Sequence, residues 1–336
     1  MGEKMEQTEN IKLQNGSPVL FIIGNGFDLG LNMKTKYEDV YESYVKTSSN
    51  SDVIRTFKRA LQKRTPYDKW SDFEMGMAEY AKTLTNEAEL IECVRDFKRH
   101  MVEHLRDENQ RVIELIRNSD YSDGLLIIKE LNNSFKNFYS CFSPNLIRQL
   151  DSINGGHINP RIITFNYTTI LDELLNLKTR YAAKDVGKPL HIHGSLDNDV
   201  VLGVNDIDQL HGTRYSLSKR GSRAFVKTVF NQQYDFQRVS EARQMISNSQ
   251  IICTYGFSMG KSDRTWVSLL IEWLKKDSNH HLIVYQYDET EWPRYNFDAL
   301  MDAEEEEKET LGKRLRQYRI KATIRIIQQV PSKNCG

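Results

Sequence analysis

Residues 19–30 read Val-Leu-Phe-Ile-Ile-Gly-Asn-Gly-Phe-Asp-Leu-Gly, an apolar segment that ends abruptly in a glycine-rich turn. Apolar residues at consecutive positions are typical of a strand in a parallel sheet that is covered on both faces. Glycine lets the backbone turn sharply and approach a ligand, and N–H groups that are free near a helix start favour phosphate or another anion. The stretch therefore predicts a buried first strand followed by a nucleotide-binding loop.

The spacing of the glycines differs from the dinucleotide-binding fingerprint. Glycines stand at positions 24, 26 and 30, whereas the fingerprint has closer spacing and an acidic residue about 20 positions later, at the end of a second strand. In place of that strand, Thr35-Lys36-Tyr37-Glu38 has the form of a helix capping box, and apolar residues follow it at helical spacing. The pattern therefore disfavours an ordinary NAD-dependent dehydrogenase.

Composition sets the class of protein. The chain has 336 residues, of which 39% are apolar, and a mean hydropathy of −0.59. No stretch is apolar enough for a membrane span, and residues 1–15 lack the apolar core of a signal peptide, so we expect a cytoplasmic protein without a membrane partner. Lys plus Arg and Asp plus Glu both number 46, so no overall positive field favours non-specific binding of nucleic acid.

Apolar periodicity divides the chain into three parts. We expect residues 1–17 to be a flexible N-terminus and residues 35–157 to form a helical insertion, because apolar residues recur there at helical spacing. Strand patterns resume at Arg161–Phe165, Leu190–His193, Val200–Leu202, Gln250–Thr254 and His281–Tyr285, with an edge strand expected within Ala322–Gln328 and a helix at Arg264–Lys276. Residues 18–34 and 158–330 are therefore predicted to form an α/β domain with a Rossmann-like parallel sheet.

Four polar motifs follow the predicted strands. They are Gly24–Asp28, Thr164–Thr168, His191–Ser195 and Tyr255–Ser258. Because the carboxyl ends of parallel strands meet at one edge of a sheet, we expect these loops to converge there. Together they supply backbone donors, a carboxylate, a carboxamide and an imidazole, which suits the ribose and phosphates of a nucleotide.

The chain resembles the AbiH family of bacterial phage abortive-infection proteins in five motifs, which are Phe21–Asp28, Trp70–Glu74, Thr164–Thr168, His191–Ser195 and Leu202–Asp206. The likeness covers residues 19–290. AbiH proteins are in turn similar to sirtuin-like and DHS-like NAD-consuming domains. The resemblance implies an anti-phage effector that hydrolyses NAD to nicotinamide and ADP-ribose, with a phage-derived trigger as a further partner.

Site residues follow from the resemblance by position. It implies that Asn166 lies beside the nicotinamide ribose and that His193 is the catalytic base. The residues that would hold NAD are Gly24, Asn25, Gly26, Phe27, Thr164, Gly194, Gly256 and Ser258. Sirtuins carry an aspartate two positions after the asparagine, where this chain has Thr168. The zinc ribbon of deacylating sirtuins is also absent, which favours a hydrolase with water as acceptor and no metal.

The chemistry of NAD cleavage fits these residue types. Breaking the bond between nicotinamide and ribose passes through an oxocarbenium-like state, so the enzyme holds the ribose and directs one water at C1′. A neutral imidazole such as that of His193 accepts the proton, and a carboxamide such as that of Asn166 orients water or ribose without adding charge. We expect Asp28 to accept from a ribose hydroxyl or to stabilise the developing positive charge.

Each of these residues also has a purely structural interpretation. Asp28 would cap the helix after the glycine turn, and Asn166 would bridge backbone groups in a turn. Asp263 precedes a predicted helix, and we expect it to be a cap and not a catalyst. His191 and His193 stand two apart on a predicted strand, so their side chains are expected on one face, with His191 supporting His193.

Two other functions stay open. His-x-His, with Asp206, Asp208 and His211 downstream, also suits a metal-dependent nuclease or phosphoesterase, although no further tight ligand cluster supports it. A non-catalytic sensor would bind NAD or a related nucleotide without turnover. The many aromatic residues of the insertion also suit a homo-oligomer, or equally a core.

Overall fold

The sheet is built from six parallel strands. In this computed structural model the described residues are 19–63, 73–118, 161–181, 187–234, 236–257, 259, 263–277, 280–286 and 315–319. The strands are β1 (Val19–Ile23), β2 (Arg161–Thr164), β3 (Leu190–His191), β4 (Ile251–Tyr255), β5 (His281–Gln286) and β6 (Leu315–Arg319). Their order is β3-β2-β1-β4-β5-β6, and every pairing is parallel. This is the order of a dinucleotide-binding Rossmann sheet, with the switch point between β1 and β4.

The predicted Rossmann-like α/β fold is therefore confirmed, while the narrower likeness to sirtuins stays a prediction. The register also brings the predicted loops to one edge. Ile23 at the end of β1 pairs with Thr164 of β2 on one side and with Tyr255 of β4 on the other, and Thr164 pairs with His191 of β3. All four motifs thus leave the sheet at neighbouring strand ends.

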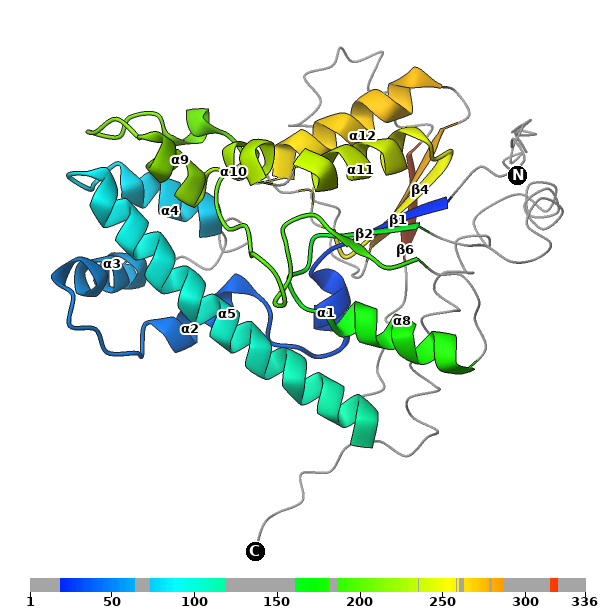
Figure 1. Cartoon of the computed structure of the whole chain (residues 1–336), viewed down its shortest axis with the longest axis horizontal. Coiled ribbons are helices and arrows are strands. Elements are labelled where there is room, and N and C mark those ends of the chain that lie inside the picture. Colours follow the sequence, from blue (N-terminus) through cyan, green and yellow to red (C-terminus); the bar gives the residue numbers. More distant parts are fainter. Residues whose placement is uncertain are drawn as a thin grey trace, which may run out of the picture.

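Helices cover both faces of the sheet, which explains the unbroken apolar run of β1. Helices α11 (Phe236–Ser247) and α12 (Arg264–Lys276) lie on one face, and α1 (Gly26–Gly30) and α8 (Ile170–Tyr181) lie on the other (Figure 1). Leu20 and Ile22 belong to the core shared with α11 and α12. All five residues of β1 are buried, as expected for a strand between two helical layers.

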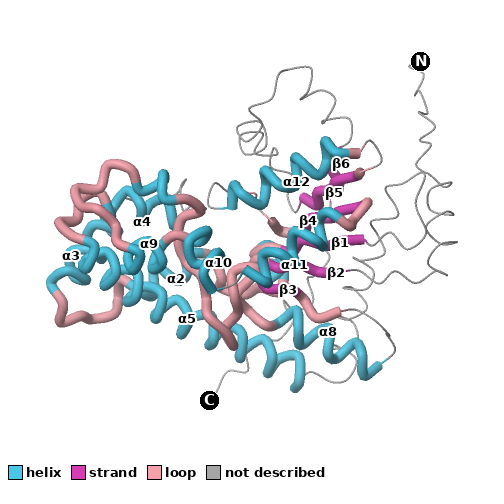
Figure 2. The backbone as a smooth tube through the Cα atoms, turned by 45° about the horizontal axis from the view of Figure 1, so that its top comes forward, coloured by secondary structure: helices cyan, strands magenta, loops and turns pink. Residues whose placement is uncertain are grey.

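A helical lobe stands beside the sheet (Figure 2). It contains α2 (Tyr37–Tyr44), α3 (Asp52–Lys63), α4 (Phe73–Ala81), α5 (Glu87–Asn118), the 3-10 helix η3 (Ile207–Leu210), α9 (Lys219–Phe225) and α10 (Lys227–Tyr234). One apolar core joins Phe57 and Phe97 of the first segment to Leu202 and Phe225 of the second. We call the described residues 37–118 and 196–234 the helical lobe, because two chain segments build it. The predicted domain boundaries stay predictions.

Two local predictions are wrong. Helix α2 begins at Tyr37, so the N-cap is Lys36, whose N–H donates to Asp39 at 3.0 Å, while the Thr35 hydroxyl donates to Asn25. The apolar run Val200–Leu202 is no strand, since it is buried in the core of the lobe and does not extend the sheet.

Several expectations fall outside the described residues. They are the edge strand within 322–328, residues 119–157 of the helical insertion, and the side chains of Trp70, Ser71 and Asp72. Among the described helices, none combines the length and apolar character that crossing a membrane requires.

Candidate functional site

A buried carboxyl group lies just past the first loop. Asp28 is only 1% exposed, and its carboxylate accepts from Asn166 Nδ2 at 2.9 Å and from Thr168 Oγ1 at 2.7 Å. Burial raises the pKa of Asp28 to about 7, against the lowering effect of these two hydrogen bonds. Asp28 lies inside α1, whose N-cap is Asn25, so the prediction that Asp28 merely caps this helix is wrong.

Asn166 is held from both sides and keeps one free acceptor. Its N–H donates to Thr164 Oγ1 at 3.1 Å, and its carboxamide nitrogen donates to Asp28. Its Oδ1 is buried and has no hydrogen-bond partner within the described residues. A buried acceptor without a partner costs about 1–3 kcal/mol, and such an atom needs an explanation. A ligand hydroxyl or a water that donates to this oxygen would provide it.

His191 is a structural clamp. Its Nδ1 lies 3.0 Å from the carbonyl oxygen of Asn166, and its Nε2 lies 2.8 Å from Asp172 Oδ2 on α8. Both ring nitrogens therefore face acceptors, and because a carbonyl or carboxylate oxygen only accepts, each contact requires a proton on the ring nitrogen that makes it. His191 thus ties the backbone of Asn166 to α8.

His193 points to a different partner. Strand β3 ends at His191, so strand alternation does not extend to His193, and the prediction that the two imidazoles share one face is wrong. His193 Nε2 lies 2.9 Å from Asp263 Oδ1, immediately before α12. Its Nδ1 is buried without a hydrogen-bond partner in the described part of the chain. Burial, aided by the charge of Lys227, lowers the pKa of His193.

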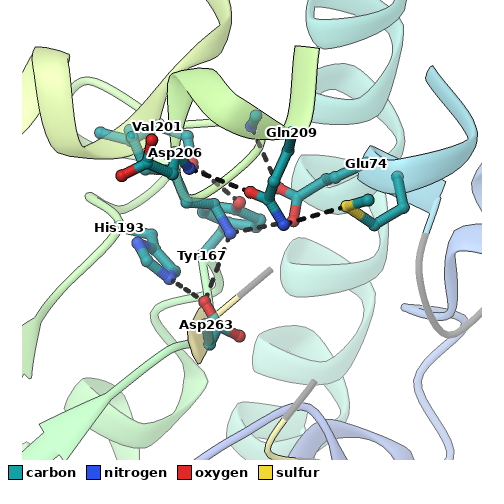
Figure 3. A network of polar contacts seen from close by, with 10 residues as sticks. Glu74, Tyr167, His193, Val201, Asp206, Gln209 and Asp263 are labelled. Atoms are coloured by element: carbon teal, nitrogen blue, oxygen red, sulfur yellow. Dashed lines mark hydrogen bonds and ion pairs between the residues drawn. The ribbon is translucent and has the colours of Figure 1, made fainter. Parts of the chain in front are cut away.

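An ionic chain leads from His193 into the helical lobe (Figure 3). Lys227 Nζ lies 3.3 Å from Asp263 Oδ1 and 2.9 Å from Glu74 Oε2, and the other oxygen of Glu74 accepts the N–H of Gly203 at 3.1 Å. Burial alone would raise the pKa of Asp263, but the charge of Lys227 and the contact with His193 hold it well below its ordinary value. Burial opposes the charge on Lys227 too, yet Asp263 and Glu74 raise its pKa.

The glycine loops pack against each other and leave no space between them. Gly24 N–H donates to the Tyr255 carbonyl and Gly26 N–H donates to the Gly256 carbonyl, both at 2.9 Å. A Cβ at Gly26 would lie 2.5 Å from Gly256 Cα. The expectation that the glycine turn frees these N–H groups for phosphate is therefore wrong for Gly24 and Gly26. Whether these loops bind NAD through other groups stays a prediction.

The other predicted NAD contacts have defined positions in the fold. Both amide atoms of Asn25 are used by Thr35, at 3.0 Å from its carbonyl and 2.7 Å from its hydroxyl. Phe27 is buried edge-on against Tyr255. Gly194 has a φ of +77°, and a Cβ there would lie 1.8 Å from the Asp199 carbonyl oxygen. Ser258 lies outside the described residues.

The predicted catalytic residues fall into two neighbouring groups. Asp28 and Asn166 are in direct contact, whereas His193 belongs to the ionic chain of Asp263. The loop after β2 joins the two groups. The centroids of the Phe165 and Tyr167 rings lie 5.2 and 6.5 Å from that of the His193 ring. Asn166, which stands between them in the chain, is hydrogen-bonded to Asp28.

Sequence reasoning missed three members of the ionic chain. Asp263 occupies the N-cap position of α12, but its side chain makes no capping bond within the described residues and pairs with His193 and Lys227 instead. Its position before a helix was the only signal, and that signal pointed to a cap. Glu74 ends one of the motifs that carry the family resemblance, and nothing near Lys227 in the sequence marks it as buried.

The proposed metal ligands do not converge. Asp206 accepts the N–H of Asp208 and so caps η3, and His211 lies 3.2 Å from Asp208 in an exposed ion pair. Within the described residues, no three His, Cys, Asp or Glu side chains form a group that could hold a metal ion. The metal-dependent alternative therefore has no geometric support in this part of the chain.

A comparison with protein families identifies the relatives of this chain. The model of the family described as bacteriophage abortive infection AbiH matches residues 20–287, which run from the second residue of β1 to just past the end of β5 and include both polar groups. The chain belongs to the AbiH family. Membership indicates a role in phage abortive infection. No curated protein matches the chain in a sequence comparison.

Proposed function

We propose that this AbiH protein acts in abortive infection by hydrolysing NAD to nicotinamide and ADP-ribose. One observation carries the proposal: Asn166 Oδ1 and His193 Nδ1 are buried acceptors without partners among the described residues, and both follow strands at the carboxyl edge of the sheet. Sheets with this strand order bind nucleotides at that edge. The buried carboxyl of Asp28 is hydrogen-bonded to Asn166 at the same place.

In the proposed reaction the bond between C1′ of the ribose and the nicotinamide nitrogen breaks, and its electron pair leaves with nicotinamide. A water oxygen bonds to C1′, and the proton released from that water passes to Nδ1 of His193. The depressed pKa of His193 keeps the ring neutral and able to accept at neutral pH. The products are nicotinamide, ADP-ribose and one proton, so atoms and charge balance.

Asp28 and Asn166 would hold the ribose. The carboxamide nitrogen of Asn166 is committed to Asp28, which leaves Oδ1 to accept from a ribose hydroxyl. With a pKa of about 7, Asp28 is partly ionised at neutral pH. Its carboxylate form would stabilise the positive charge that develops on the ribose in the transition state.

The burial of these groups bears on regulation. Asp28, Asn166 and His193 are 1%, 7% and 4% exposed. NAD would therefore reach them only after the surrounding loops or the helical lobe move. A site that is closed at rest suits an effector that a phage-derived trigger opens, since uncontrolled NAD loss would harm the host cell.

The test is nicotinamide release from NAD by the full chain in the presence of EDTA. We expect release by the native protein, and a loss of at least about 10²-fold in both His193→Ala and Asn166→Ala. His211→Ala is the matched control, because its imidazole is exposed and pairs only with exposed Asp208 among the described residues. We expect His211→Ala to keep the native rate.

Because the site is buried at rest, the same assay is repeated in phage-infected cells. There we expect NAD to fall with the native protein but not with His193→Ala. Stable NAD during infection, with protection intact, would contradict the proposal.

A further inference from the structure

We infer that Asp263 is the positioning residue of His193, and that Lys227 and Glu74 of the helical lobe hold Asp263 in place. The inference rests on the proposed function, because it explains how His193 would act as a base. It assigns a role to three charged residues that the reaction itself does not use, of which Lys227 and Glu74 are buried and Asp263 is partly exposed.

The argument begins with the shared oxygen Asp263 Oδ1. His193 Nε2 lies 2.9 Å from this atom, and Lys227 Nζ lies 3.3 Å from it. An ionised carboxylate only accepts hydrogen bonds, so His193 Nε2 must carry the proton that it donates. In the neutral ring the lone pair then belongs to Nδ1, which is the nitrogen without a partner among the described residues. Asp263 thus selects the tautomer that a base needs.

A comparison with His191 shows that an aspartate partner alone does not make a base. His191 Nε2 lies 2.8 Å from Asp172, a distance close to that of the His193 and Asp263 pair. The Nδ1 of His191, however, faces the carbonyl of Asn166 and has no free lone pair. Of these two histidines, only His193 combines a carboxylate on Nε2 with an Nδ1 that has no partner among the described residues.

The helical lobe supplies the other half of the arrangement. Lys227 begins α10, and Glu74 lies in α4 and is itself fixed by the N–H of Gly203. Lys227 is 4% exposed and Glu74 is 2% exposed. Burying charges is unfavourable unless they are paired and hydrogen-bonded, so each charge requires the others. The position of Asp263, and with it the tautomer of His193, therefore depends on the docking of the lobe.

The first measurement is the tautomer of His193, observed by long-range ¹H–¹⁵N NMR of the full chain labelled at histidine. The signals are assigned by their absence in His193→Gln. We expect a protonated Nε2 and a bare Nδ1 in the native protein, and a mixture of both tautomers in Asp263→Ala. Asp263→Asn keeps the shape of the side chain but can turn its NH₂ donor toward Nε2, so we expect part of His193 to shift to the tautomer protonated at Nδ1. Asp172→Ala is the matched control and should change the signals of His191 while leaving those of His193 unchanged.

The second measurement is nicotinamide release by the same variants. We expect Asp263→Ala and Asp263→Asn each to lower kcat by at least about 10²-fold with little change in KM. In His193→Ala, adding Asp263→Ala should cause no further loss, because the two residues act as one unit.

The two measurements separate the inference from the proposed function. Without nicotinamide release by the purified forms and without a fall of NAD in infected cells, the proposed function fails, but the NMR signature still decides the role of Asp263. A native His193 protonated at Nδ1, or a native-like tautomer in Asp263→Ala, would overturn the inference. If Asp263→Ala does not fold, Asp263→Asn and the native tautomer still decide it.

Discussion

The amide of Gly26 donates to the carbonyl of Gly256 at 2.9 Å, so the loop after β1 and the loop after β4 touch backbone to backbone. This contact lies at the switch point of the sheet, between two strands whose following helices, α1 and α12, cover opposite faces (Figure 1). Gly256 has a φ of +62°, which favours glycine, and a Cβ there would lie 2.5 Å from Gly26 Cα. The contact therefore fixes α1, and Asp28 within it, relative to α12.

Gly256→Ala should destabilise the protein. The added methyl group meets backbone atoms that cannot rotate away, and alanine is strained at a positive φ, so we expect a loss of about 2–4 kcal/mol in the free energy of unfolding. Gly76→Ala is the control, because Gly76 lies on an exposed position of α4 with nothing within 4 Å of an added Cβ. That substitution should stabilise the helix by about 0.5–1 kcal/mol. Urea unfolding measures both changes in the free energy of unfolding. If Gly256→Ala and Gly76→Ala change it equally, the close contact between Gly26 and Gly256 is contradicted.

Asp28 should make stability depend on pH. Its pKa in the folded protein is about 7, above the ordinary 3.8, so between these values the folded protein binds a proton that the unfolded chain has released. The free energy of unfolding should therefore fall as pH rises from about 4 to about 7. Asp28→Asn does not titrate and can still accept from Asn166. As pH rises over this window, the native protein should lose stability relative to Asp28→Asn, by an amount on the order of a few kcal/mol.

This dependence is measured by urea unfolding of both proteins at pH 5 and pH 8. Other titrating groups are common to both proteins and cancel in the difference. A difference that is constant with pH would show that Asp28 titrates near its ordinary value.

Much of the sheet could be predicted from the sequence because its strands are buried on both sides. The apolar runs of β1, β4 and β5, and helix α12 at Arg264–Lys276, lie where periodicity placed them. The run Val200–Leu202 looks the same as a strand in sequence, but its partners are helices of the lobe. Periodicity reports burial, and it does not say which element covers a segment.

The site could be predicted only in part. Asn166 and Asp28 follow strands that lie side by side, so the rule that parallel strand ends converge was enough to bring them together. Lys227 and Glu74 are 153 positions apart in the chain and meet through the packing of the lobe. No local spacing encodes such a contact. The contacts of His193 depend on that packing, so sequence patterns could name the histidine but not which of its ring nitrogens lacks a partner among the described residues.

Lys227→Met tests the buried ionic chain. Removing the ammonium leaves Glu74 and Asp263 buried without their cation, so we expect a loss of about 3–5 kcal/mol in the free energy of unfolding. Adding Glu74→Gln should recover part of that loss, because one of the two unpaired charges is then neutral. Lys82→Met, which breaks an exposed pair with Glu79, is the control and should cost at most about 1 kcal/mol. If the effects of the Lys227 and Glu74 substitutions on the free energy of unfolding are additive, the two charges are not coupled and the proposed ionic chain is contradicted.

Thr168→Val tests the hydrogen bond that Asp28 receives from the Thr168 hydroxyl at 2.7 Å. Valine keeps the shape of threonine and lacks the donor. Because this bond lowers the pKa of Asp28, its loss should raise that pKa further and move the window of pH dependence upward.

A hydrogen bond to an ionised group is worth more than one to a neutral group, so the cost of Thr168→Val should grow with pH. We expect it to reach about 1.5–3 kcal/mol at pH 9, where Asp28 is ionised, and to be smaller at pH 5. Thr168→Ser keeps the donor and should retain the native pH window. Urea unfolding of the native protein, Thr168→Val and Thr168→Ser at both pH values measures these costs. If Thr168→Val costs the same free energy at pH 5 and at pH 9, the hydrogen bond from the hydroxyl does not depend on the charge of Asp28.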